Sequence, residues 1–245
     1  MNKSSFGTHF TVSTWGESHG KALGAVVDGC PAGLSLCEED IQKFLDRRKP
    51  GQSRYTTARK EGDLVEILSG VFEGKTTGTP VSLMVRNTDQ RSRDYGNIAY
   101  SYRPGHADYT FDAKYGFRDY RGGGRSSGRE TIGRVAAGAI ASKILDSMGI
   151  TFCTYTKSIG PVSVTEFVPE EINNNAFYMP DAEAAKRAGA YLEECMKNQD
   201  SAGGVVECRI TGVPAGLGNP VFEKLDAMLA QAVMSIGSVK AIEIG

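Results

Sequence analysis

Apolar residues recur at alternate positions in several stretches of the chain, which is the spacing of a half-buried β-strand. Residues 10–15 (Phe-Thr-Val-Ser-Thr-Trp) and 23–28 predict the first two strands. Residues 64–72 and 80–86 predict a further pair, joined by the turn-rich residues 73–79. Strands are also expected at 151–168 and 205–213, with a short last strand at 239–244.

A spacing of three to four residues takes over elsewhere and predicts helices. The longest series includes Ile132, Ala139 and Ile140 and continues to residue 148. Ser127 and Glu130 have the spacing of a capping box, so this helix is expected to start between them.

Three further helices are predicted. Ser35 and Glu38 form a second capping-box pattern, and the helix after it should stop at residues 49–51 (Lys-Pro-Gly). Residues 181–198 and 220–236 carry apolar stripes at helical spacing. Residues 89–124, by contrast, are polar and rich in tyrosine with little period, which is typical of a functional or mobile segment.

One short string occurs twice. Residues 29–34 (Gly-Cys-Pro-Ala-Gly-Leu) return as residues 212–217 (Gly-Val-Pro-Ala-Gly-Leu), each between a predicted strand and a predicted helix. This context indicates an internal strand–turn–helix duplication. The first copy continues into the hairpin at 64–86, whereas the second ends after 239–244, so we expect the chain to be cut short.

The composition is that of an ordinary globular protein, with 245 residues of which 40% are hydrophobic and 23% are charged. Such a length allows one large domain or two small ones. No apolar run predicts a membrane span, and residues 1–9 lack a signal core. Five scattered cysteines without a C-x-x-C pair suggest reduced thiols and a cytoplasmic protein, and no metal site is predicted.

The net charge of −1 conceals an uneven distribution of charge. Residues 47–134 contain 13 arginines and four lysines against 10 acidic residues. Arginine is the side chain suited to bidentate contact with phosphate or carboxylate, whereas a solvated basic face is more often rich in lysine. We therefore expect a site for a multiply charged anion. A nucleic-acid site is the rival interpretation, but it is disfavoured because the whole chain is slightly acidic.

The glycine-rich residues 122–131 are the centre of this region. Arg125, Arg129 and Arg134 lie around the expected helix start, where the positive end of the helix dipole disfavours cations. An anion between them, most simply a phosphate, would explain their placement. The alternative is an ordinary capped helix with solvated arginines.

Two histidines lie in turns that present polar side chains. His19 is bracketed by glycines in residues 16–20 (Gly-Glu-Ser-His-Gly), and it is either a general acid or base or a structural turn residue. His106 lies on a Pro-Gly turn with Asp108 two residues away. That carboxylate either orients the imidazole or only caps the turn.

Taken in order, these motifs resemble the signatures of the chorismate synthase family. The likeness rests on five strings and covers essentially the whole chain. They are residues 16–20, 46–54 (Asp-Arg-Arg-Lys-Pro-Gly-Gln-Ser-Arg), 103–108 (Arg-Pro-Gly-His-Ala-Asp), 121–131 and 212–218.

The resemblance implies an α+β fold in which antiparallel sheets enclose helices as a β-α-β sandwich, a single domain over residues 1–245, and a homotetramer. It implies that 5-enolpyruvylshikimate 3-phosphate loses phosphate and a C6 proton in an anti-1,4-elimination that gives chorismate. Reduced FMN is the implied cofactor, with NADPH as a possible reductant. It implies no nucleic acid or membrane partner.

The resemblance also implies roles for residues. His19 protonates the departing phosphate and His106 serves the flavin. Arg48 and Arg54 hold the substrate phosphate or NADPH, with Arg129 and Arg134 as further anion-site candidates. The FMN contacts are implied for Arg125, Ser126, Ser127, Gly237 and Ser238.

Family chains generally continue well beyond residue 245, with further FMN contacts and a proposed base in that part. An inactive fragment that only binds phosphate-bearing ligands is therefore the alternative to an active enzyme.

Overall fold

The structure is a computed structural model that describes residues 4–51, 55, 61–88 and 99–245. The chain divides into two compact units. Unit 1 comprises Met1–Lys49, Arg59–Ile144 and Pro214–Gly245, and unit 2 comprises Pro50–Ala58 and Leu145–Val213. Mixed helices and antiparallel sheets give the α+β class that was expected.

Unit 1 is built on a five-stranded antiparallel sheet with the order β1-β2-β3-β7-β4. The strands are β1 (Ser5–Phe6), β2 (Thr11–Gly16), β3 (Ala22–Asp28), β4 (Val65–Ser69) and β7 (Val81–Arg86). The predicted pairing of 64–72 with 80–86 is confirmed as β4 on β7. The chain between them forms a separate small hairpin of β5 (Val71–Phe72) and β6 (Lys75–Thr76).

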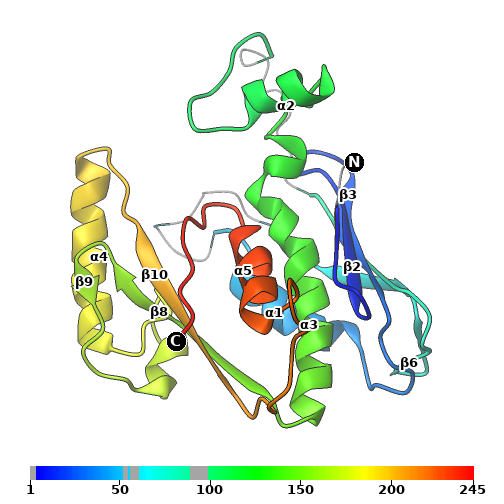
Figure 1. Cartoon of the computed structure of the whole chain (residues 1–245). Coiled ribbons are helices and arrows are strands. Elements are labelled where there is room, and N and C mark those ends of the chain that lie inside the picture. Colours follow the sequence, from blue (N-terminus) through cyan, green and yellow to red (C-terminus); the bar gives the residue numbers. More distant parts are fainter. Residues whose placement is uncertain (1–3, 52–54, 56–60, 89–98) are drawn as a thin grey trace. The chain divides into compact units, whose positions relative to one another are not determined.

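Two helices pack on one face of this sheet, α1 (Glu38–Arg48) and α3 (Thr131–Ser147) (Figure 1). The alternation of β3 and β7 explains why, since every second side chain faces the helices. Leu23, Val27 and Val85 from the strands, with Ile41 from α1 and Ile140 from α3, belong to one buried cluster. This core fixes the ends of both helices against the sheet.

Unit 2 has a three-stranded antiparallel sheet with the order β10-β8-β9. Its strands are β8 (Thr151–Ile159), β9 (Val162–Ser163) and β10 (Gly204–Thr211). A 3₁₀ segment, η4 (Pro169–Asn173), precedes helix α4 (Ala182–Lys197), whose small residues pack on Met179. The predicted helix at 181–198 is therefore confirmed, with Asp181 as its N-cap residue.

The expected capping box at Ser35 and Glu38 is wrong. Helix α1 begins at Glu38, and the carboxylate of Asp40 accepts a hydrogen bond of 3.1 Å from the backbone N–H of Cys37. Ser35 lies before the helix and forms an isolated backbone bridge with Lys75. The observed capping box is formed by Cys37 and Asp40, and cysteine is not among the residues by which a capping box is recognised in sequence.

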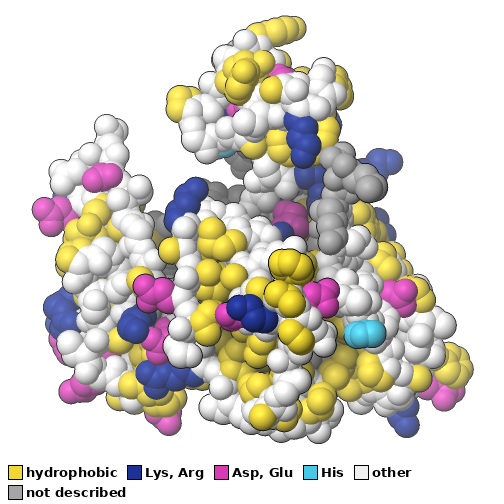
Figure 2. All heavy atoms as spheres, viewed as in Figure 1, with side chains coloured by type: hydrophobic (Ala, Val, Ile, Leu, Met, Phe, Trp, Pro, Cys, Tyr) yellow, Lys and Arg dark blue, Asp and Glu magenta, His cyan; other side chains and the backbone are white. Residues whose placement is uncertain are grey.

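Two elements near the end of the chain are smaller than predicted. Helix α5 spans only Leu225–Met234 of the predicted 220–236, and Phe222 is 90% exposed. Residues 240–245 have no regular structure, so the predicted strand at 239–244 is wrong. A strand needs a partner edge, and alternating residues without one form none. Apolar side chains lie exposed over α5 on the face shown in Figure 2.

The segment 89–124 is not without structure. Helix α2 (Asp108–Tyr115) lies within it, although residues 89–98 fall outside the described residues. Ion pairs hold this helix: the Asp108 carboxylate lies 2.9 Å from Arg103 Nε and 3.4 Å from Arg118 Nη1. Contacts of this kind leave no trace in hydrophobic periodicity.

The internal duplication is visible in the backbone. The first turn connects β3 to α1 and the second follows β10 and precedes α5. The first glycines, Gly29 and Gly212, have φ of +81° and +76°, and the second, Gly33 and Gly216, have +87° and +94°. Only glycine adopts this left-handed region readily, so both copies need glycine at both positions.

Candidate functional site

One end of the five-stranded sheet collects most of the predicted site residues. Strand β2 ends at Gly16 and pairs there with Leu23 at the start of β3, while β7 ends at Arg86 opposite Ala22. Two further site residues lie at helix ends: Arg48 is the last residue of α1, and Arg129 lies in the 3₁₀ turn directly before α3. The contacts described below connect both arginines with the turn at 17–21.

His19 is buried in this turn, with 8% of its surface exposed. Its Nδ1 lies 3.0 Å from the Ser18 hydroxyl oxygen, and that hydroxyl donates a hydrogen bond of 3.3 Å to the carbonyl of Gly122. A hydroxyl has one proton, so while Ser18 donates to the Gly122 carbonyl its oxygen can only accept from an imidazole Nδ1–H. In that tautomer the neutral ring has its lone pair on Nε2.

Gly122 makes this arrangement possible. Its φ is +64°, and a Cβ atom there would lie 2.0 Å from His19 Nδ1. No real Cβ atom approaches a ring nitrogen so closely, so the absence of a side chain allows the ring to occupy its place. The glycine run of the motif is thus in direct contact with the histidine of a motif a hundred residues earlier.

The turn that carries His19 is held by Asn87, which directly follows β7. The side-chain Nδ2 of Asn87 donates to the carbonyls of Glu17 (3.0 Å) and Gly20 (2.9 Å). Its backbone N–H donates to the carbonyl of Lys21 at 3.1 Å. The Asn87 Oδ1 in turn accepts from Arg129 Nε at 3.1 Å. Every polar group of this amide is used on the turn or its support.

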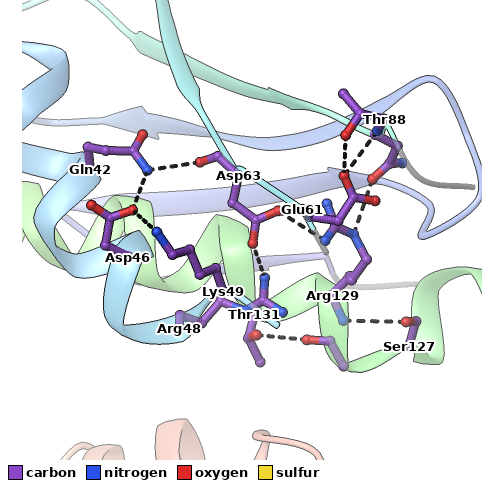
Figure 3. A network of polar contacts seen from close by, with 12 residues as sticks. Gln42, Asp46, Arg48, Lys49, Glu61, Asp63, Thr88, Ser127, Arg129 and Thr131 are labelled. Atoms are coloured by element: carbon purple, nitrogen blue, oxygen red, sulfur yellow. Dashed lines mark hydrogen bonds and ion pairs between the residues drawn. The ribbon is translucent and has the colours of Figure 1, made fainter. Parts of the chain in front are cut away.

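Asp63 links Arg129 to Arg48 (Figure 3). Its side chain is fully buried, with Oδ2 2.7 Å from Arg48 Nη1 and Oδ1 3.0 Å from Arg129 Nη1. Asp63 has a φ of +45°, in the left-handed region. A second buried acid, Glu61, accepts from the backbone N–H and the hydroxyl of Thr88 at 3.1 and 2.7 Å. The arginine-rich end of the sheet therefore contains buried carboxylates as well.

The three arginines around the start of α3 all have protein partners, and Arg125 and Arg134 share Glu130. Arg125 donates to the Thr14 hydroxyl at 2.6 Å and to the carbonyl of Gly16 at 3.1 Å. Arg129 is buried on Asp63, as described above. Arg134 lies 2.8 Å from the Glu130 carboxylate. The structure brings Arg129 toward Arg48 rather than grouping all three, and an anion at these arginines stays a prediction.

The expected capping box at Ser127 and Glu130 forms only in part. Two 3₁₀ turns, η2 (Gly124–Ser126) and η3 (Gly128–Glu130), precede α3. The Ser127 hydroxyl accepts from the Arg129 backbone N–H at 3.3 Å. The Glu130 carboxylate accepts from Thr14 at 2.9 Å and from Arg134, so it braces the sheet and the helix instead of the cap.

The predicted FMN residues lie in two segments of unit 1. The Ser126 hydroxyl donates to the Gly123 carbonyl at 2.7 Å. Gly237 and Ser238 follow α5, and Ser238 has a φ of +72°. Arg134 brings this second segment to α3, since its Nη1 donates to the Ser235 hydroxyl at 2.6 Å.

His106 is exposed, and its Nδ1 lies 3.0 Å from the carbonyl of Pro104. Of the two roles weighed for Asp108, capping the turn is confirmed, because its carboxylate accepts from the backbone N–H of Arg103 at 3.0 Å. The same carboxylate also accepts from the Arg103 guanidinium and pairs with Arg118. These cations hold the pKa of Asp108 well below its usual range, chiefly through the Arg103 hydrogen bond. Of the predicted anion-binding residues, Arg54 lies outside the described residues.

Comparison with known proteins decides what this set of residues belongs to. The family model described as chorismate synthase matches residues 10–245. The chain belongs to the chorismate synthase family. A chorismate synthase of Agathobacter rectalis is 70% identical over the whole chain, and one of Novosphingobium aromaticivorans is 58% identical. The chain covers 67% and 69% of these relatives.

A solved chorismate synthase structure is similar to this chain in fold. It matches with a TM-score of 0.79 and 34% sequence identity over 97% of this chain and 68% of that one. The family thus extends through both compact units. Among the residues that the structure describes, no helix is both long and apolar enough to cross a membrane.

Sequence reasoning missed three residues of this site. Ser18 lay inside a recognised motif but was given no role, and Asn87 and Asp63 lay in no motif. The signal for the latter two was their place beside predicted strands, since Asn87 directly follows β7 and Asp63 lies two residues before β4. Which arginine each would meet depends on the packing of α1 and α3, and spacing does not encode that.

Proposed function

We propose that this chain carries out the chorismate synthase reaction on a small phosphorylated acid, 5-enolpyruvylshikimate 3-phosphate. Membership of the family makes it a lyase of aromatic biosynthesis. The observation that carries the site assignment is the chain of contacts from Arg48 through Asp63, Arg129 and Asn87 to the turn of His19. It connects a cation for the phosphate with a histidine that exchanges protons.

The proposed chemistry separates the work of these residues. A phosphate is a poor leaving group unless its charge is neutralised as the carbon–oxygen bond breaks. Arg48, and by resemblance Arg54, would hold the phosphate. His19 in its cationic form would give the Nε2 proton to the departing oxygen, while Ser18 holds Nδ1. The C6 proton leaves in the same overall elimination, and no oxidation state changes.

The residues present fit a phosphate-bearing flavin. Gly122, Gly123 and Gly124 all have positive φ, so three successive positions admit no side chain without strain. Backbone N–H groups in such a turn, with the Ser126 and Ser127 hydroxyls beside them, are a donor set suited to phosphate. Arg129 Nη1 and Nη2 are both buried without a hydrogen-bond partner among the described residues, although Nη1 lies 3.0 Å from Asp63 Oδ1 as an ion pair.

Reduced FMN at this place would supply reducing chemistry that is returned within each turnover, because the reaction has no net redox change. Arg125, Ser126, Ser127, Gly237 and Ser238 are the residues proposed to hold it, and His106 is proposed to serve it. Use of NADPH, a homotetrameric state and a cytoplasmic location are further parts of this proposal that rest on the family resemblance.

An anaerobic assay tests the proposal. The purified chain is mixed with photoreduced FMN and 5-enolpyruvylshikimate 3-phosphate, and chorismate formation is followed against protein concentration. We expect the rate of chorismate formation to be proportional to the concentration of the chain. In His19→Asn this rate should fall at least about 100-fold, which is the lower end of what general acid catalysis contributes. No chorismate from a folded preparation that binds the substrate would overturn the proposed activity of this chain.

A further inference from the structure

Asp63 contacts both arginine arms of the site, which are Arg48 and Arg129. Its carboxylate uses one oxygen for each arm, with Arg48 from the end of α1 on Oδ2 and Arg129 from η3, directly before α3, on Oδ1. Helices α1 and α3 also share a direct ion pair, between Asp40 and Lys143. Asp63 is the carboxylate that joins the guanidinium groups of Arg48 and Arg129 to each other.

Burial makes this geometry rigid. The Asp63 side chain has no exposed surface, and Arg129 and Arg48 side chains are 6% and 18% exposed. A buried carboxylate without its cations would be costly, so it stays between them. Two guanidinium groups on one carboxylate leave a positive charge of one unit, which reaches solvent mainly at Arg48. The cluster is thus balanced enough to be buried and still attracts an anion.

The second arm ends at the histidine turn. Arg129 donates from Nε to Asn87, and Asn87 holds the carbonyls on both sides of Ser18 and His19. A displacement of the Arg129 guanidinium would be passed to Asn87, because its planar fork makes both contacts at once.

We propose that Asp63 is a positioning residue for the reaction. It holds the guanidinium of Arg48 where the substrate phosphate binds and, through Arg129 and Asn87, fixes the turn that presents His19. This inference rests on the proposed function for the identity of the ligand, but the geometry of the two arginines is independent of it.

Asp63→Asn is the variant that tests this role. Asparagine has nearly the volume of aspartate and is among the residues that tolerate a φ of +45°, so the backbone is preserved while the negative charge is lost. Glu66→Gln is the matched control, because it also removes one acid from an acid–arginine pair. Glu66 lies 2.8 Å from Arg86, but both side chains are exposed and away from the site contacts.

Three quantities are measured on each variant: the dissociation constant of 5-enolpyruvylshikimate 3-phosphate by calorimetry without flavin, and KM and kcat in the chorismate assay. For folded Asp63→Asn we expect binding at least about 10-fold weaker and a fall in kcat of similar size, with Glu66→Gln unchanged. Binding and kcat within about twofold of the parent chain would overturn the proposal.

A double-variant cycle separates positioning from a general loss of stability. Asp63 acts on the phosphate through Arg48, so Asp63→Asn should add little further loss of affinity once Arg48→Gln is present. If the losses of substrate affinity in Asp63→Asn and Arg48→Gln multiply in the double variant, Asp63 does not act through Arg48. An ion pair with only a structural role predicts either such multiplication or no effect of Asp63→Asn on affinity.

A measurement on the unaltered chain covers the case in which Asp63→Asn does not fold. Nitrogen relaxation of the Arg48 Nε–H without ligand reports whether the guanidinium is fixed. We expect an order parameter close to that of the rigid backbone, and a value typical of a flexible surface arginine would overturn the proposal. Substrate binding without chorismate formation would refute the proposed function alone, since affinity and relaxation do not depend on turnover.

Discussion

Gly122 and His19 show, at the scale of single residues, that an absent side chain can define the position of a proposed catalytic group. The imidazole lies in the space that a Cβ of residue 122 would fill. The Ser18 hydroxyl connects the same two residues by hydrogen bonds. The position of the ring is thus fixed by shape on one side and by hydrogen bonding on the other.

Gly122→Ala should displace His19. The new methyl group would lie 2.0 Å from Nδ1 in a residue with φ of +64°, so either the ring or the glycine turn must move. We expect kcat in the chorismate assay to fall at least about 10-fold, since a misplacement near 1 Å can cost about 100-fold. Two results together would contradict this prediction: a kcat equal to that of the parent chain, and a crystal structure of the variant with the His19 ring in its original place.

Recognition of the motifs located His19 and Arg48 by sequence but not the residues that hold them. A histidine between glycines is visible in a linear string, because its neighbours in sequence are its neighbours in space. Asp63 and Asn87 act on partners that are 15 to 70 positions away. Their role follows from the packing of helices on the sheet, which a single sequence does not display.

At the scale of elements, helix α3 contains two glycines with opposite surroundings. A Cβ on Gly133 would lie 2.9 Å from the carbonyl oxygen of Gly24 and from the Thr14 methyl carbon. Gly138 is exposed, and a Cβ there would meet nothing within 4 Å. The first glycine allows the helix to approach the sheet closely, and the second has no such use.

Alanine at these two positions should change stability in opposite directions. Gly133→Ala forces helix and sheet apart, and overpacking of about 1–3 kcal/mol exceeds the gain in helix propensity of about 1 kcal/mol. Gly138→Ala receives only that gain, so it should stabilise by about 0.5–1 kcal/mol. Urea denaturation of both variants measures the two free energies of unfolding. Equal changes of the same sign in the two free energies of unfolding would show that α3 is not tightly packed against the sheet at Gly133.

Element prediction succeeded where the apolar pattern was decided by burial and failed where it was not. Strands β3 and β7 and helix α4 bury one side, so their periods were informative. Helix α2, which depends on the Asp108 ion pairs, was not predicted. Helix α5, which has no buried residue among those described, was predicted but is shorter than expected. Residues 239–244 alternate in sequence yet form no strand, because alternation specifies a face and not a partner.

At the scale of the whole molecule, we expect a destabilising substitution in one compact unit to affect local unfolding in that unit and not in the other. Asp181 caps α4 in unit 2, where its carboxylate accepts from the backbone N–H groups of Ala184 and Thr165 at 2.8 and 2.9 Å. These hydrogen bonds hold the pKa of Asp181 well below its usual range. The carboxylate form is therefore part of the stability of unit 2.

Asp181→Ala should cost about 1–2 kcal/mol at pH 7, as loss of a helix N-cap does. The folded pKa is depressed, so the stabilisation is present above the unfolded pKa of about 4 and is lost as the pH falls below it. The difference in unfolding free energy between parent and variant should therefore shrink from pH 5 toward pH 2. Hydrogen exchange should accelerate in residues 145–213 and not in unit 1.

Asp200→Ala is the control for that variant. Asp200 is exposed and accepts only a local hydrogen bond from the Ser201 backbone N–H among the contacts described. It should change neither stability nor its pH dependence measurably. A pH-independent deficit in Asp181→Ala would contradict the role of the carboxylate charge, and equal acceleration of exchange in both units would contradict their independence.

The turn at residues 29–34 recurs at residues 212–217, so the chain contains the same local sequence in two different surroundings. The two copies differ in sequence only at their second residue, Cys30 in one and Val213 in the other. Cys30 is 3% exposed, whereas Val213 is 40% exposed, yet the flanking glycines keep nearly the same torsion angles. The six-residue string therefore determines its backbone conformation locally, whether its second residue is buried or exposed. It should keep that conformation when it is grafted between a strand and a helix of another protein.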